Sequence, residues 1–304
     1  MLEREKRDEV PFRYGPAAFA VLWMLACIAI WYGNRDNWLG GKEVVVPMFC
    51  LGVGGYLALL LPSLGLSWRI LSRESVVVIA CSLTCFSLLW LFGRRGSYPF
   101  ELPYPLEGIE HLYTFFYFSA SCVVLRMLVP MLLSHLYLNK NPRDYGYSWG
   151  GKSRFIWIYV VLFVGAIPMV WWASKQPAFV AKYPLCRNAI EGGVLSIQVF
   201  IMYQLAYGLV FVSGESFWRG YMLFGAGRQL GRNALIIMLI PYVIAHFGKP
   251  PVETVGAMGA GLLLGYLAWE HRSFWLGVFV HWGVGLMMDC LALVERNVQW
   301  TLEW

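Results

Sequence analysis

Long apolar runs recur along the whole chain and are separated by short polar stretches. Each run has roughly the 17–25 residues that a helix needs to cross a bilayer. The approximate bounds of the runs are 17–33, 44–66, 76–93, 112–138, 155–173, 193–222, 233–247, 254–270 and 273–294. Because backbone groups inside a bilayer must be satisfied within their own segment, each run is predicted to be a helix. The pattern therefore predicts an all-α fold, a polytopic transmembrane helical bundle of eight or nine spans.

Turn residues support these boundaries. A polar loop with a proline occupies 139–144, and Lys249-Pro250-Pro251 cannot continue a helix because proline lacks the backbone donor. The following run contains Gly261-x-x-x-Gly265, a spacing that lets a neighbouring helix approach closely. We expect this run to pack tightly against another helix.

Composition points to the same class of protein. The chain has 304 residues, of which 59% are hydrophobic and 14% charged, whereas soluble domains carry about 25% charged residues. The net charge of +6 then indicates orientation and contact with the lipid bilayer rather than nucleic acid. If the N-terminus is placed in the cytoplasm, thirteen Lys and Arg residues lie on the cytoplasmic side of the membrane and nine on the opposite side. This excess favours a cytoplasmic N-terminus. The seven cysteines lie mostly in apolar runs and are expected to pack rather than form disulfides.

Ionisable side chains inside the later runs are the candidates for function, because a charge in hydrocarbon is costly and usually faces the protein interior. Glu215 and Arg219 are four residues apart, which puts them on one face of a helix in the favourable order for pairing. The pair could be purely structural, although buried ion pairs are weak stabilisers.

Two histidines follow in the next runs. Taken singly, His246 and His281 would be interpreted as satisfied core groups, but together with Glu215 they indicate a shared polar site. Asp289 lies two turns after His281, about 80° around the helix. It could orient His281, and it could equally be an ordinary polar residue at the membrane surface.

A carboxylate and imidazoles suffice to activate water. The predicted catalytic residues are Glu215, His246 and His281, with Arg219 and Asp289 as supporting residues. In this hypothesis Glu215 activates water with His246, His281 stabilises the oxyanion, and Arg219 holds Glu215 in place. Zinc at Glu215, His246 and His281 is the alternative, since these residue types also form catalytic zinc sites. No His-Glu-x-x-His motif is present, so a site without metal or other cofactor is favoured.

These residues, in this order, resemble the CPBP family, the CAAX-protease and bacteriocin-processing intramembrane peptidases. The family pattern is Glu-Glu-x-x-x-Arg, then Phe-x-x-x-His, then His-x-x-x-Asn or Asp. The counterparts are Glu215 to Arg219, Tyr242-x-x-x-His246, and His281. The resemblance implies a peptidase core at 193–294, N-terminal transmembrane helices of unassigned role at 1–192, and a short tail at 295–304. It also implies an integral protein of the bacterial inner membrane that hydrolyses a peptide or membrane-protein substrate.

The sequence departs from the family pattern at three positions. Gly214 occupies the first glutamate position, Gly285 occupies the Asn or Asp position, and Tyr242 replaces phenylalanine. The alternative is therefore a catalytically inactive CPBP-like protein that binds a membrane partner. Transport, with Glu215, Arg219 and Arg126 as relay groups, is a third hypothesis, but no inverted repeat is visible in the sequence.

Overall fold

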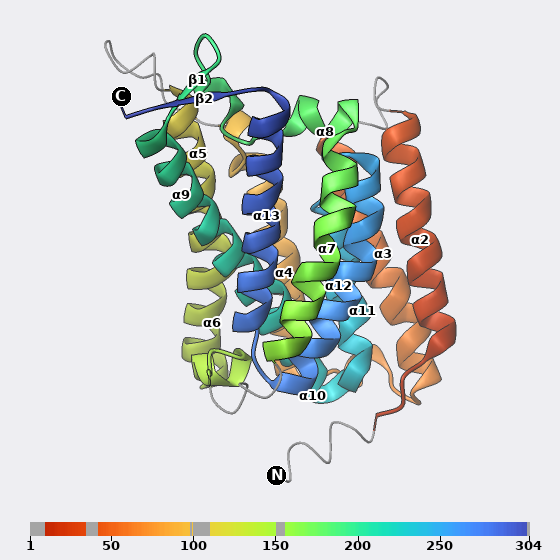
Figure 1. Ribbon diagram of the computed structural model, residues 1–304. Helices are drawn as coiled ribbons and strands as arrows, with labels where there is room; N and C mark the ends of the chain where they lie inside the picture. The colour runs from red at the N-terminus through yellow and green to blue at the C-terminus, as the bar shows by residue number, and fades with distance from the viewer. Residues whose placement is uncertain (1–9, 35–41, 98, 100–109, 150–155, 303–304) are drawn as a thin grey trace.

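The computed structural model describes residues 10–34, 42–97, 99, 110–149 and 156–302. Of the described residues, 81% are helical, and eight helices among them are long and apolar enough to cross a membrane. The prediction of a polytopic helical bundle is confirmed. The first and last described segments lie at opposite ends of the bundle (Figure 1).

In the described part of the chain, ten α-helices form the body of the bundle, two π-helical segments interrupt it, and a pair of short strands lies at one end. The α-helices of the body are α2 (Tyr14–Gly33), α3 (Lys42–Ser63), α4 (Arg73–Phe92), α5 (Glu110–Val123), α6 (Val129–Leu138), α7 (Ile156–Ser174), α9 (Ile197–Glu215), α11 (Ala234–Ile244), α12 (Pro251–His271) and α13 (Trp275–Glu295). The shorter helices are α8 (Pro177–Lys182) and α10 (Leu223–Leu230). The π-helical segments are η5 (Val124–Leu128) and η9 (Ser216–Met222). The 3₁₀ turns are η2 (Trp68–Ile70), η3 (Arg95–Ser97), η6 (Pro142–Tyr145), η8 (Arg187–Ala189) and η10 (Gly231–Asn233), and the strands are β1 (Val194–Ser196) and β2 (Gln299–Thr301).

The stretch Ile197–Ile244 explains why the span count lies between eight and nine. It is one apolar stretch of 48 residues, which as a straight helix would be more than twice the roughly 30 Å thickness of the hydrocarbon layer. Gly231 interrupts it with φ +57°, a conformation that favours glycine. After this turn α11 packs back against α10 and η9. The two predicted runs 193–222 and 233–247 are therefore separate antiparallel arms.

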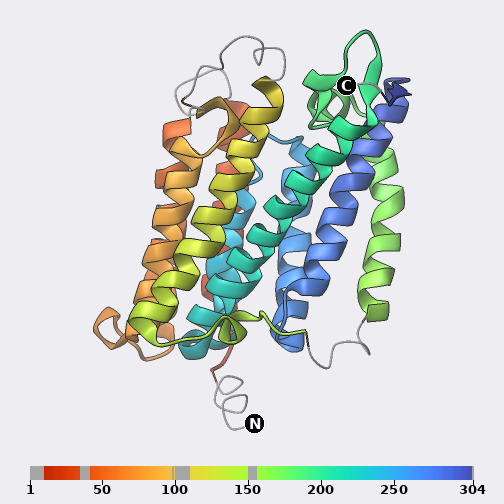
Figure 2. The same cartoon turned by 90° about the vertical axis from the view of Figure 1, so that its left-hand side faces the viewer.

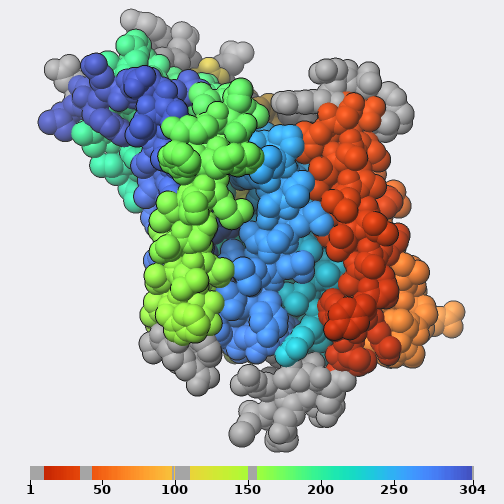
Figure 3. Space-filling view, turned by 45° about the vertical axis from the view of Figure 1, so that its right-hand side comes forward, coloured from red at the N-terminus to blue at the C-terminus, as the bar shows by residue number. Residues whose placement is uncertain are grey.

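Figure 2 shows α9 tilted across the bundle, with α5 and α6 on one side and α13 on the other. Helix α7 packs on the far side of α13, and together with α12 and α2 it forms an outer face of the molecule (Figure 3). Only 11% of the residues in the apolar stretch of α7 are buried inside the protein, although the helix is strongly apolar. Such a helix is stable where its outer face meets lipid.

Helix α11 lies at the centre, and all its residues are buried. A helix that is apolar on every side belongs in such a position. The predicted close packing of α12 is confirmed, because a Cβ at Gly261 would lie 2.7 Å from Leu239 and one at Gly265 would lie 2.8 Å from Met238. The glycines of α12 thus let it lie directly on α11.

The chain beyond α13 returns to the start of α9. Strand β2 pairs in parallel with β1, with Leu195 opposite Trp300. All seven cysteines lie in the described ranges and all are free, as expected. The proposed division at residues 192 and 294 stays a prediction, since α2 to α4 pack into the same apolar core as α10 and α11.

Candidate active site

The predicted ion pair lies where α9 passes into the π-helical segment η9. Arg219 Nη1 donates to Glu215 Oε1 at 2.8 Å, and the side chains are 0% and 1% exposed. The Arg219 guanidinium also lies 4.1 Å from the centre of the Tyr242 ring, an attractive cation–π distance. A π-helical segment is rare and is frequently found at functional sites, and here it carries the arginine of the pair.

Helix α13 brings His281 to the same carboxylate. His281 Nδ1 lies 2.8 Å from Glu215 Oε1, so Oε1 accepts from both the arginine and the histidine. Gly277, one turn earlier on α13, makes this approach possible, because a Cβ there would lie 3.0 Å from Glu215 Oε2. The structure therefore joins two of the predicted catalytic residues by a direct hydrogen bond.

The third predicted residue, His246, follows the end of α11. Its Nδ1 lies 2.8 Å from the Tyr242 carbonyl oxygen, four residues earlier in the chain. This local hydrogen bond orients the His246 ring. The Tyr242 ring lies next to both imidazoles, with centroid distances of 4.7 Å to His246 and 6.3 Å to His281. Three separate helical segments thus bring Glu215, His246 and His281 around one tyrosine.

These hydrogen bonds determine the proton position on each neutral ring. A carbonyl oxygen and a carboxylate oxygen are acceptors only, so Nδ1 of both His246 and His281 carries the proton. The other ring nitrogen, Nε2, is then an acceptor on each neutral imidazole. The two histidines consequently offer two basic nitrogens, whereas the carboxylate of Glu215 is engaged by Arg219 and His281.

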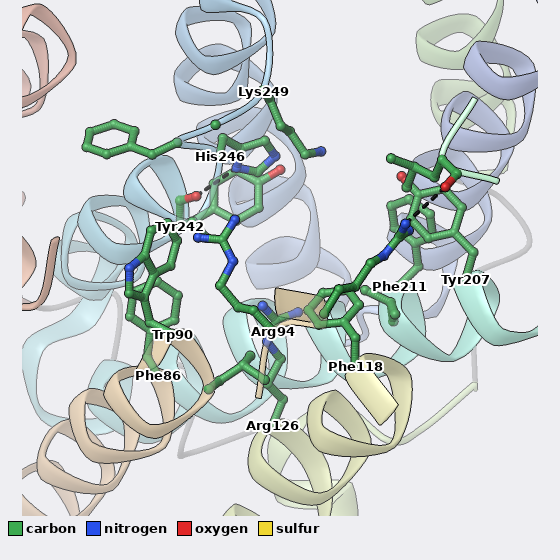
Figure 4. Close-up of a pocket in the computed structure, with 18 of the residues that line it drawn as sticks. Phe86, Trp90, Arg94, Phe118, Arg126, Tyr207, Phe211, Tyr242, His246 and Lys249 are labelled. Atoms are coloured by element: carbon green, nitrogen blue, oxygen red, sulfur yellow. Dashed lines mark hydrogen bonds between the residues drawn. The ribbon is translucent and has the colours of Figure 1, made fainter. Parts of the chain in front are cut away.

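A cavity of about 670 Å³ reaches these residues. Glu215, Tyr242, His246 and His281 are among its lining residues, and aromatic side chains cover much of the wall, among them Phe86, Trp90, Phe118, Tyr207 and Phe211. Figure 4 shows His246 and Tyr242 beside Arg94, Arg126 and Lys249 in this cavity. The His281 side chain is 23% exposed, against 1% for Glu215. The imidazole is therefore the more accessible member of that pair.

Arg126 is a cavity residue to which sequence reasoning gave no role in hydrolysis. It belongs to the π-helical segment η5, which packs against η9, and its guanidinium lies 5.7 Å from the Trp218 ring. The signal was present in the sequence, because an arginine inside an apolar span is a functional candidate by default. Its proximity to Gly214 and Trp218 could not be predicted from the sequence.

The two glycines at the family's polar positions have different surroundings. A Cβ at Gly214 would lie 3.7 Å from Arg126 Nη1, so this position faces the arginine and has room for a side chain. A Cβ at Gly285 would lie 2.7 Å from Phe211 and 3.1 Å from Tyr207. The face beside Gly285 is therefore filled by aromatic rings rather than left open.

Asp289 makes its contacts away from His281. Its Oδ1 accepts from the Leu185 backbone N–H at 2.8 Å, and its Oδ2 accepts from Gln204 Nε2 at 2.8 Å. The side chain is buried rather than placed at a membrane surface. Neither hydrogen bond reaches His281, which is oriented by Glu215 instead. These contacts join α13 to α9 and to the segment before η8.

The donor arrangement bears on the zinc alternative. Glu215 and His281 bond to each other through Oε1 and Nδ1, whereas ligands that share an ion would direct these atoms to the metal. Among the described residues, no group of three or more His, Cys, Asp and Glu side chains is arranged to hold a metal ion. The absence of a cofactor stays a prediction.

Comparison with known families gives a match to part of the chain. Residues 196–287 match the family model described as type II CAAX prenyl endopeptidase Rce1-like. Comparisons with curated proteins and with solved structures gave no significant match. The matched segment runs from α9 into α13 and contains all three motifs that carry the CPBP resemblance, which is thereby confirmed. At the family level the match supports an integral membrane protease of the CAAX type.

Proposed function

We propose, from the premise that residues 196–287 form an Rce1-like peptidase segment, that the protein is an intramembrane endopeptidase that hydrolyses a peptide bond by water activated at His281 and His246. The observation that carries the proposal is the hydrogen bond between Glu215 and His281 beside a cavity that His246 also lines. An oriented, partly accessible imidazole paired with a buried carboxylate is an arrangement suited to general base catalysis.

In the proposed reaction the substrate carbonyl lies in the cavity beside the two Nε2 atoms. Water attacks the carbonyl carbon, and its proton passes to His281 Nε2. Glu215 is a positioning residue that orients His281 through Nδ1 and stabilises the imidazolium that forms. When the carbon–nitrogen bond breaks, the imidazolium gives the proton to the leaving amine. The products are a new carboxyl terminus and a free amine.

The remaining polar groups have supporting roles in this proposal. His246 Nε2 accepts a hydrogen bond from the attacking water, and Arg126 stabilises the negative charge that develops on the carbonyl oxygen. These roles differ from the sequence hypothesis, in which Glu215 takes the proton and His281 stabilises the oxyanion. The reason is accessibility, because Glu215 is 1% exposed and its Oε1 already accepts two hydrogen bonds.

A membrane location follows for the substrate. The aromatic wall of the cavity suits an apolar peptide segment, and the substrate class that we propose is a membrane-associated peptide or membrane protein in the bacterial inner membrane. We assign the end of the bundle that carries the N-terminal helix start to the cytoplasm, because the loops predicted for that side carry more Lys and Arg. The matching family's description names prenylated CAAX substrates, and a farnesylated peptide is a further candidate.

The proposal is tested with full-length protein in lipid nanodiscs and a peptide library that includes farnesylated members, with new termini identified by mass spectrometry. Wild type is compared with His281→Ala, His246→Ala and His135→Ala, the last being the same change at an exposed residue of α6. We expect cleavage by wild type and His135→Ala, and a loss of about 10²-fold or more in both cavity variants. Equal cleavage by His281→Ala, or none by wild type, would contradict the proposal.

Gly214 favours one second function, which is binding of a membrane partner without cleavage. The position lacks the family's first glutamate, yet it has space for a side chain next to Arg126. If the protein only binds, wild type should leave the library intact and Gly214→Glu should gain cleavage. Cleavage by wild type that Gly214→Glu does not increase would reject this second function.

A further inference from the structure

The cavity wall carries far more positive than negative charge. Six cationic side chains line it, from Arg94, Arg95, Arg126, Lys182, Arg187 and Lys249, and the acidic lining residue is Glu215. Glu215 is already paired with Arg219, and Lys249 Nζ is paired with Glu253 at 2.7 Å. Within the described ranges, the other five cations form no ion pair with an acidic side chain.

Three of these side chains are held in place by contacts with uncharged groups, although Asp289 also acts on Arg95 through space. Arg94 lies over the Trp90 ring at 4.1 Å, and Arg95 lies over the Phe115 ring at 4.1 Å. Arg95 Nη1 also donates to the Leu185 carbonyl at 3.0 Å, and Arg187 Nη1 donates to the Lys182 carbonyl at 2.8 Å. Carbonyls and aromatic faces fix a guanidinium, but they do not neutralise it.

The cations are close enough to affect one another. Burial, followed by the charges of Lys249, Arg94, Arg187 and Arg95, lowers the pKa of Lys182 to about 8. Burial likewise lowers the pKa values of Arg94 and Arg95, and Arg126 contributes to the shift of Arg94. Gathering like charges around a partly buried space costs free energy that is recovered when an anion enters.

An ordinary surface role does not account for this arrangement. Basic residues at a membrane boundary normally extend outward to lipid headgroups, whereas these line a cavity together with Trp90 and Phe118 (Figure 4). Helix α8, which ends in Lys182, lies at the end of the bundle opposite to the N-terminal end (Figure 1). Lys182, together with Arg187, which donates to the Lys182 carbonyl, therefore lies toward this end of the bundle.

We infer that the cavity selects a peptide whose segment on the α8 side of the reacting bond is anionic, with carboxylates supplied by Asp or Glu side chains or by a free C-terminus. This inference rests on the proposed function, because the two imidazoles line the same cavity. Arginine pairs well with carboxylates through its fixed set of donors. Arg94, Arg95, Lys182 and Arg187 are then specificity-determining residues, and the aromatic wall receives the apolar part of the peptide.

Peptide binding tests this inference separately from cleavage. Full-length protein is placed in phosphatidylcholine nanodiscs, and four peptides with one apolar half and an uncharged fluorophore are titrated by anisotropy. In three of the peptides the other half contains alanines, three Asp or three Lys, and the C-terminus is amidated. In the fourth peptide the other half contains alanines and ends in a free C-terminal carboxylate. We expect the Asp peptide to bind about tenfold or more tightly than the amidated alanine peptide, the Lys peptide to bind most weakly, and salt to reduce the preference.

A double variant tests whether the cavity cations cause the preference. Arg94→Gln with Arg187→Gln should abolish the preference for the Asp peptide. The matched control is Arg69→Gln with Arg143→Gln, which removes the same charge from exposed residues in the loops at the other end of the bundle (Figure 2). The control should bind like wild type. The thermal unfolding midpoint of each variant shows whether a loss of preference comes from misfolding, and Arg94→Lys, which keeps the charge, should retain most of the preference.

Three outcomes would overturn the inference. The first is equal binding of acidic, neutral and basic peptides, and the second is a preference that survives in the Arg94 and Arg187 double variant. The third is loss of acidic-peptide binding when phosphatidylglycerol is added to the nanodiscs, which would identify a lipid phosphate site. If the free carboxylate alone gives the preference, the anion is the C-terminus. Selective binding without cleavage would support the preference for anionic peptides and reject hydrolysis, and unselective cleavage would support hydrolysis and reject the preference.

Discussion

Glu215 shows how one carboxylate can serve both stability and chemistry. Its Oε1 accepts from Arg219 and from His281, each at 2.8 Å. The first bond keeps the guanidinium from being buried unpaired, and the second fixes the imidazole. Because the carboxylate is 1% exposed, the proposed mechanism has it act through His281. The proposed mechanism depends on this division between a buried anion and an accessible base.

Glu215→Gln is expected to lower stability markedly. The change leaves Arg219 fully buried without its carboxylate, and loss of one partner of a buried pair costs about 3–5 kcal/mol. Thermal unfolding, monitored by tryptophan fluorescence, should show a lower unfolding midpoint for this variant. The control is Glu295→Gln, which breaks a half-exposed pair with Lys175 worth at most about 1 kcal/mol. Equal midpoint shifts in the two variants would contradict the buried-pair interpretation.

Some of the contacts of individual residues could be predicted from the sequence. The four-residue spacing predicted that Glu215 and Arg219 share a helix face, and the structure confirms their contact. The partners of Asp289 were not predictable, because Leu185 and Gln204 lie 104 and 85 residues away along the chain. Spacing within one helix predicts local pairs, and only tertiary packing decides which distant group a side chain meets.

At the scale of helices, glycines on one face position the site. Gly277 lets α13 approach Glu215, and Gly261 lets α12 lie against Tyr242, whose ring is next to both imidazoles. The π-helical segments η5 and η9 lie against each other and carry Arg126 and Arg219. Glycines at these helix contacts therefore set the distances between the site residues on which the proposed reaction depends.

Gly261→Ala is expected to disturb the site. Its Cβ would lie 2.8 Å from the Tyr242 ring and 2.7 Å from Leu239, and overpacking of this kind costs about 1–3 kcal/mol. Gly259→Ala on the same helix is the matched control, since nothing lies within 4 Å of a Cβ there. We expect a lower unfolding midpoint and slower peptide cleavage for Gly261→Ala alone. Equal behaviour of the two variants would show that α12 does not support Tyr242.

Hydrophobic runs predicted most helix bounds because a membrane span is set by length and apolar content. The predicted runs 155–173 and 273–294 correspond closely to α7 and α13. The π-helical segments could not be predicted, because no composition signal distinguishes Val124–Leu128 from the α-helix around it. The Gly231 reversal was predicted only as a gap between two runs, since its cause is a single backbone angle.

At the scale of the molecule, the N-terminal helices do more than fill the membrane. Residues of α2, α4 and η5 line the cavity that the matched segment closes with α9, α11 and α13. Sequence reasoning assigned residues 1–192 no role in hydrolysis, because single cations in loops look like orientation signals. Only the folded chain shows that Arg94, Arg95 and Lys182 gather around the same cavity as His281.

The most direct test of the central claim is cleavage in water enriched in oxygen-18, with a library peptide that wild type cuts in nanodiscs. Mass spectrometry of the products measures whether the new carboxyl terminus gains the label from water. We predict one labelled oxygen at that terminus in wild type, and product formation reduced about 10²-fold or more in His281→Ala. An unlabelled new terminus, or an undiminished rate in His281→Ala, would contradict hydrolysis by water activated at the histidine that Glu215 holds.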